Sequence, residues 1–130
     1  MTKFRHNGLT HTGLVRKVNE DSILVLPDQK IWVVADGMGG HTGGDFASQN
    51  VVDSVAMIPL NLEPADRMQA LRGAIQSAHK NILAEIEARG GAVIGAAVVA
   101  MMVAGEHFVV FWAGDCRLYR LRNKEIDMLT

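Results

Sequence analysis

The chain has 130 residues, 48% hydrophobic and 21% charged, a composition that predicts one folded domain over residues 1–130 and excludes a disordered tail. Thirteen Lys and Arg residues against fourteen Asp and Glu residues give a net charge of -1, so neither nucleic acid nor a membrane surface is an expected partner. The single cysteine, Cys116, has no internal disulfide partner, and residues 1–13 lack the apolar run of a signal peptide. We therefore expect a cytoplasmic protein.

The first predicted elements form a β-hairpin. Ile23 and Val25 precede a turn at residues 27–29 and a strand over residues 30–35, which is apolar on both faces and is therefore expected to be buried. The strand should end at Asp36, because residues 36–44 hold five glycines in nine positions. That density of glycine predicts a loop without regular structure.

Two helices are predicted after the glycine-rich segment. Apolar residues recur at helical spacing from about Asp45 to Met57, before Pro59. A second helix begins near Pro64 and ends before Gly90-Gly91. A single apolar stripe on this helix predicts that it covers one face of a sheet. The stripe consists of Met68, Leu71, Ile75, Ala78, Ile82 and Ile86.

Further strands are expected at residues 93–103, 107–113, 117–121 and 125–129. Strands, then two helices, then strands indicate an α+β fold with helices on one face of a largely antiparallel sheet. No predicted element closes the sheet after the last strand. We therefore expect uncovered sheet edges through which the chain could self-associate.

Three carboxylates lie where strands meet flexible segments, and they are candidates for one site. Glu20 and Asp21 precede the first strand, and Asp36 follows the second. Converging anions need a cation, and hard oxygen ligands favour Mg²⁺ or Mn²⁺ over zinc. Gly37 leaves its backbone carbonyl open to a metal, and Arg16 is near enough to bind a phosphate with two parallel hydrogen bonds. Each feature alone is typical of an ordinary turn or a solvated loop.

The sequence does not match other nucleotide-binding or metal-binding motifs. A P-loop needs a Gly-Lys pair, which the sequence lacks, and a dinucleotide fingerprint starting at Gly37 has Thr42 at its third glycine position. The histidines show no His-Glu-x-x-His spacing, so a zinc protease has no support.

Three ordered motifs span nearly the whole chain. They are residues 12–16 (TGLVR) with 19–21 (NED), residues 34–41 (VADGMGGH) with 47–48 (AS), and residues 113–120 (AGDCRLYR). Together they resemble the motifs of the bacterial metal-dependent Ser/Thr protein phosphatases of the PP2C (PPM) family. The resemblance implies an α-β-β-α sandwich, of which this chain supplies the front, amino-terminal portion.

The resemblance also implies the chemistry. Two or more Mg²⁺ or Mn²⁺ ions would activate a water that hydrolyses phosphoserine or phosphothreonine in a protein, opposing a Ser/Thr kinase. The catalytic residues implied are Asp36, which would bridge two ions, and Arg16, which would bind the substrate phosphate. The metal ligands implied are Glu20, Asp21, Asp36, Gly37 and, near a third metal position, Asp115.

The sequence departs from the family pattern at several points. The carboxy-terminal aspartates that complete the metal centre of the family have no counterpart here, and Ala96-Ala97 replaces the usual Thr-Thr. Met38 lies where eukaryotic relatives have a histidine that is proposed as the general acid. The proton for the leaving group would therefore come from water or from His41. Cys116, in place of a serine, is either a small buried residue at the start of a strand or a redox-active thiol. A catalytically incomplete module that binds a phosphoprotein without hydrolysing it is therefore the alternative function.

Overall fold

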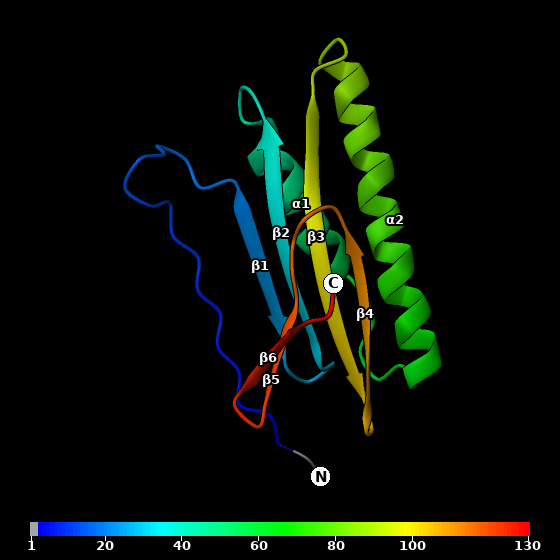
Figure 1. Ribbon diagram of the computed structural model, residues 1–130. Helices are drawn as coiled ribbons and strands as arrows, with labels where there is room; N and C mark the ends of the chain where they lie inside the picture. Colours follow the sequence, from blue (N-terminus) through cyan, green and yellow to red (C-terminus); the bar gives the residue numbers. More distant parts are fainter. Residues whose placement is uncertain (1–2) are drawn as a thin grey trace.

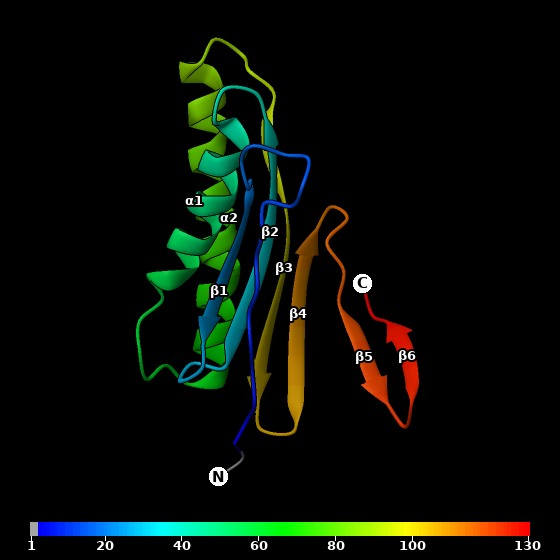
Figure 2. The same cartoon turned by 90° about the vertical axis from the view of Figure 1, so that its left-hand side faces the viewer.

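The computed structural model describes residues 3–130, so the first two residues of the expected domain lie outside the described residues. The elements, in chain order, are β1 (Asp21–Leu26), β2 (Ile31–Gly39), α1 (Gly43–Ala56), α2 (Pro64–Ala88), β3 (Ile94–Ala104), β4 (His107–Ala113), β5 (Tyr119–Arg122) and β6 (Glu125–Met128). Strands β1 to β4 form one antiparallel sheet in chain order, and β5 and β6 form a separate antiparallel hairpin. The helices cover one side of the sheet and the hairpin lies on the other (Figures 1 and 2). The predicted α+β fold with two helices and antiparallel strands is confirmed.

The hydrophobic core lies between the four-stranded sheet and the two helices. In β2, Ile31, Val33 and Ala35 are at most 2% exposed and alternate with side chains that point to the other face. From α2, Leu71 is fully buried, and the rest of the predicted stripe is buried or packs against the core. Burial of each large apolar side chain contributes about 1.5–3 kcal/mol, so this layer stabilises the fold that carries the site. No helix within residues 3–130 is long and apolar enough to cross a membrane.

The glycine-rich segment is more regular than its composition predicts. β2 continues through Asp36 to Gly39, and α1 already begins at Gly43, so the irregular loop is only residues 40–42. Gly37 pairs with Ala96 in β3, and a Cβ on Gly37 would lie 2.0 Å from the carbonyl oxygen of Gly44. The prediction of a loop over residues 36–44 is therefore wrong, because Gly37 lies within a strand and allows β2 and α1 to approach closely.

The sheet face opposite the helices is only partly covered. Val34 in β2 is 45% exposed and Trp112 in β4 is 53% exposed. The expectation that the second strand is buried on both faces is therefore wrong. The reason is visible in Figure 2, where the β5–β6 hairpin is a small second layer and leaves part of the sheet open.

We expect this open face to make the 130-residue chain self-associate. Exposed apolar patches are removed from water on contact, so the average mass in size-exclusion chromatography with light scattering should rise with protein concentration. Trp112→Ser should reduce the association. Met57→Ser, which removes an 81% exposed apolar side chain at the end of α1, should not. A mass that stays monomeric at all concentrations would contradict this prediction.

Candidate active site

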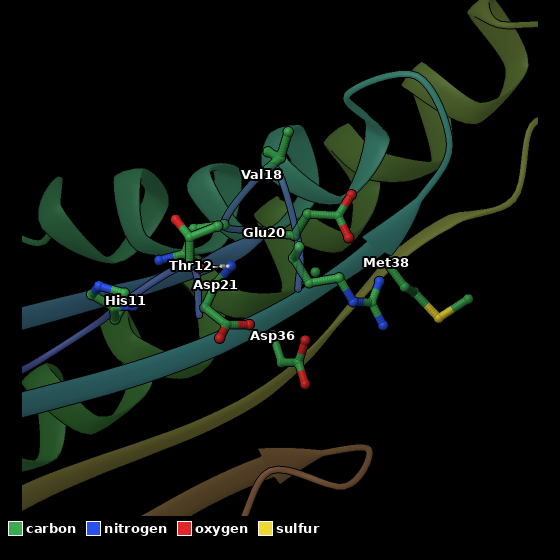
Figure 3. A pocket seen from close by; sticks show the side chains of 10 residues that line it. His11, Thr12, Val18, Glu20, Asp21, Asp36 and Met38 are labelled. Carbon is green, nitrogen blue, oxygen red and sulfur yellow. Dashed lines mark hydrogen bonds between the residues drawn. The ribbon is translucent and has the colours of Figure 1, made fainter. Parts of the chain in front are cut away.

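Two carboxylates face one another at the end of the β1–β2 ladder. Asp21 is the first residue of β1 and pairs directly with Asp36 of β2. Both lie on the sheet face opposite the helices, because their neighbours Ser22 and Ala35 point to the helix side. Figure 3 shows the two carboxyl groups turned towards one another. Like charges directly across a ladder are destabilising, so this pair needs a proton or a cation between its members.

The electrostatics of Asp36 reflect this crowding. Partial burial raises the pKa of the Asp36 carboxyl above its usual value, and the hydrogen bond and negative charge of Asp21 raise it further. The charge of Asp115 acts in the same direction. A divalent cation would remove the same repulsion without a proton.

A pocket of about 390 Å³ opens around the carboxylate pair. It is lined by His11, Thr12, Arg16, Val18, Asn19, Glu20, Asp21, Asp36, Gly37 and Met38. The structure therefore brings Arg16, Glu20, Asp21, Asp36 and Gly37 of the sequence-predicted set to one cavity. Asp115 does not line it, although its charge reaches Asp36.

Histidine is placed differently from expectation. The sequence suggested His41 as the histidine beside the site, but His41 is an exposed residue of the loop at 40–42 and does not line the pocket. His11 does line it, and its Nδ1 accepts a hydrogen bond from the Gly13 N–H at 2.8 Å. The reason is that β2 continues for three residues beyond Asp36 and carries the loop away from the carboxylate pair.

Glu20 lines the pocket but does not join the carboxylate pair. Its side chain lies over Gly44, whose added Cβ would be 2.7 Å from the Glu20 carboxyl carbon. Its backbone carbonyl accepts a hydrogen bond from the Gly37 N–H at 3.0 Å. Figure 3 shows the Glu20 carboxylate turned away from those of Asp21 and Asp36. Within residues 3–130, no three or more His, Cys, Asp or Glu residues are grouped so that they could hold a metal ion.

Gly44 and Asn19 have roles at the site that were not assigned from the sequence. Gly44 provides the open space into which Glu20 folds, and the signal was the glycine pair at the start of the helix. Asn19 orders the turn before β1, because its side-chain oxygen accepts the Asp21 N–H at 3.0 Å and its amide donates to Thr10 at 2.7 Å. This local pattern is typical of Asn in turns.

Cys116 lies near the carboxylates and is partly buried. Burial raises the pKa of its thiol, and the charges of Asp36, Asp115 and Asp21 raise it further. A raised pKa leaves little thiolate at neutral pH, which favours the small, partly buried residue over the redox-active thiol.

The residues present fit a hard divalent cation. The donors are carboxylate oxygens in an open, water-accessible pocket, and the closest pair carries uncompensated like charge. Mg²⁺ binds through one or two carboxylates and keeps several waters, so two opposed aspartates are a sufficient protein contribution.

The raised pKa of Asp36 gives a stability prediction for the metal-free chain. Because the folded-state pKa lies above the unfolded value near 3.8, the folded state is penalised as pH rises through the interval above 3.8. Asp36→Asn should therefore unfold at a slightly higher temperature than wild type at pH 7. The effect is small because water screens the exposed carboxyl pair, and it should vanish below pH 3.8. Thermal unfolding in chelator tests this, and a less stable Asp36→Asn at pH 7 would contradict it.

Gly44→Ala should weaken Mn²⁺ binding without unfolding the chain. The new Cβ would meet the flexible end of Glu20, which swings away at little cost but leaves the pocket wall. We expect about tenfold weaker binding, the scale of a lost supporting contact. Gly73→Ala is the matched control, because nothing lies within 4 Å of its Cβ position in α2. Unchanged affinity in Gly44→Ala, measured by calorimetry, would rule out a role for Glu20.

Comparison with known families and proteins identifies relatives of this chain. The family model described as protein phosphatase 2C matches residues 12–130. Serine/threonine protein phosphatase PstP of Mycobacterium tuberculosis is 32% identical over 127 residues, which cover 97% of this chain and 24% of that protein. Serine/threonine phosphatase stp of Listeria welshimeri is 34% identical over 132 residues, which cover 93% of this chain and 51% of that protein.

Solved structures of bacterial proteins superpose on this chain. PppA, described as a key regulatory component of T6SS in Pseudomonas aeruginosa, superposes with a TM-score of 0.94 at 39% identity, over 99% of this chain and 56% of that one. The catalytic domain of PstP, solved in complex with two manganese ions, superposes with a TM-score of 0.83 at 32% identity, over 92% of this chain and 52% of that one. The chain thus spans between a quarter and just over half of the length of these relatives.

Proposed function

Because this chain belongs to the protein phosphatase 2C family, we propose that it contributes the metal-binding front part of a phosphatase that hydrolyses phosphoserine and phosphothreonine in proteins. The observation that carries the proposal is the Asp21–Asp36 pair, which opens with Arg16 into one pocket. Neither a simple turn nor a solvated loop accounts for two opposed carboxylates and a guanidinium in one cavity.

We propose that Asp21 and Asp36 hold Mg²⁺ or Mn²⁺, with the carbonyl of Gly37, Glu20 and, at a further position, Asp115 as additional ligands or partners of bound water. The manganese-bound relative supports this choice of metal. When bound, a pair of such ions activates water as a nucleophile and offsets negative charge on the phosphate. The carboxylates fix where that chemistry happens, because Asp21 and Asp36 are set by the β1–β2 register.

Arg16 binds and orients the phosphate in this proposal. Its guanidinium can donate two parallel hydrogen bonds to phosphate oxygens, which selects a tetrahedral dianion and turns the ester bond towards the carboxylates. His11 also lines the pocket, but its Nδ1 accepts a hydrogen bond from the Gly13 N–H. In this proposal, water therefore supplies the proton to the departing serine or threonine oxygen.

The remaining expectations stand as parts of the same proposal. Residues 1–130 form the front of a phosphatase domain whose carboxy-terminal part is not in this chain, in line with the roughly half coverage of the solved relatives. The phosphoprotein substrates are those of a Ser/Thr kinase, and the protein acts in the cytoplasm.

The test is hydrolysis of a phosphothreonine peptide by the 130-residue chain. We expect phosphate release with Mn²⁺ that stops when a chelator is added and is restored by excess Mn²⁺. An unphosphorylated peptide and a heat-unfolded sample serve as controls. Release that persists in chelator would contradict a metal-dependent reaction.

A binding module without hydrolysis is the second candidate. One observation favours it: residues 3–130 offer no group of three acidic, His or Cys ligands around one point. This module would bind the phosphothreonine peptide through Arg16, release no phosphate, and bind the peptide equally well in chelator. Hydrolysis in the previous experiment excludes it.

A further inference from the structure

The loop between β2 and α1 has a strained backbone. His41 and Thr42 have φ angles of 52° and 66°, in the left-handed region that non-glycine residues rarely adopt. Thr42 is the N-cap residue of α1, yet its side chain makes no capping hydrogen bond to the helix. Two successive strained residues persist only where neighbouring structure holds them.

Arg89, just beyond the end of α2, contacts the loop and the first turn of α1. Its Nη1 donates to the His41 carbonyl oxygen at 2.9 Å, and its guanidinium carbon lies 5.8 Å from the ring centroid of Phe46 in α1. Its Nε pairs with the Glu85 carboxylate at 2.8 Å, which fixes the plane of the guanidinium. Within residues 3–130, no other side chain from a distant element hydrogen-bonds to a carbonyl of residues 40–42.

The first turn of α1 is in turn packed against the pocket. Gly44 leaves only the space that the Glu20 carboxylate occupies, and its carbonyl lies against Gly37. A shift of this turn towards Glu20 would therefore displace the Glu20 side chain. The contacts run from Arg89 through the loop to Gly44 and then to Glu20.

We propose that Arg89 is a positioning residue, which clamps the loop at 40–42 and the first turn of α1 so that Glu20 stays at the wall of the metal pocket. The expected effect of Arg89 on Mn²⁺ binding rests on the proposed function. The clamp also predicts a backbone effect in the metal-free chain. The Arg89 side chain forms its hydrogen bonds and ion pair within residues 3–130 with His41 and Glu85, neither of which lines the pocket, so its influence passes through the backbone.

The test compares wild type, Arg89→Ala, Arg89→Lys and Arg72→Ala, the last removing an exposed arginine of α2. Amide hydrogen exchange without metal should be at least several times faster over residues 40–46 in Arg89→Ala, with exchange in β3 unchanged. Mn²⁺ binding, measured by calorimetry, should weaken about threefold to tenfold. Arg89→Lys should recover part of both effects, because it keeps a cation and one donor, and Arg72→Ala should match wild type.

The outcomes separate the two proposals. Unchanged exchange over residues 40–46 in Arg89→Ala overturns the clamp. Faster exchange with unchanged Mn²⁺ affinity overturns the positioning role. If wild type binds no Mn²⁺, the metal-binding proposal fails on its own, and exchange alone decides whether Arg89 holds the loop.

Discussion

Replacing Asp36 by alanine should abolish Mn²⁺ binding by the chain. Asp36 lies directly opposite Asp21, and the negative charges of Asp21 and Asp115 both act on it. Removing Asp36 leaves Asp21 without its opposed carboxylate, and Glu20, whose carboxylate is turned away from the pair, does not replace it. We expect at least a hundredfold weaker binding in calorimetry, together with loss of any Mn²⁺-dependent phosphate release.

The matched control is Asp28→Ala. Asp28 is an exposed acid in the turn between β1 and β2, at the opposite end of the same hairpin. The two variants change the net charge equally, so a general electrostatic effect would weaken both alike. Equal Mn²⁺ affinities in Asp36→Ala and wild type would contradict the metal site.

Arg16→Ala should weaken binding of a phosphothreonine peptide by about 10-fold to 100-fold. Charge-assisted hydrogen bonds from a guanidinium contribute about 1.5–3 kcal/mol, and about 1.4 kcal/mol corresponds to a tenfold change in affinity. Arg16→Lys should recover part of the loss, because lysine keeps the charge but not the two parallel donors. Fluorescence anisotropy of a labelled peptide with Mn²⁺ measures the effect whether or not hydrolysis follows.

Two comparisons keep the Arg16 prediction specific. The unphosphorylated peptide should bind equally weakly to wild type and Arg16→Ala. Arg122→Ala, which removes an exposed arginine of β5 that does not line the pocket, should bind the phosphopeptide as wild type does. If Arg16→Ala leaves the affinity for the phosphopeptide unchanged, the phosphate group binds to another part of the surface and the prediction is contradicted.

Local patterns were sufficient to predict the helices and the strands along the chain, but not that β5 and β6 form a separate hairpin. The α2 stripe begins near Met68 and ends near Ile86, and its spacing of three and four residues allows only one buried face. Asp21 and Asp36 were also predictable as neighbours, because a short turn fixes the register of a hairpin. These features depend on residues close together in the sequence.

The glycines and Glu20 could not be placed in this way. Gly37 and Gly44 look like loop residues in the sequence, but each is a point where two backbones meet, and that meeting depends on how α1 packs on β2. The direction of the Glu20 side chain follows from the same packing. The contact from Arg89 to His41 joins residues 48 positions apart, and no local pattern encodes it.

Anomalous diffraction from crystals of the chain soaked in Mn²⁺ tests the central claim most directly. We predict a peak between the carboxylates of Asp21 and Asp36, at about 2.1 Å from the nearest oxygen, which disappears in crystals of Asp36→Ala. No peak at this pair at saturating Mn²⁺, or a peak that persists in Asp36→Ala, would contradict the assignment of this pocket as the metal centre.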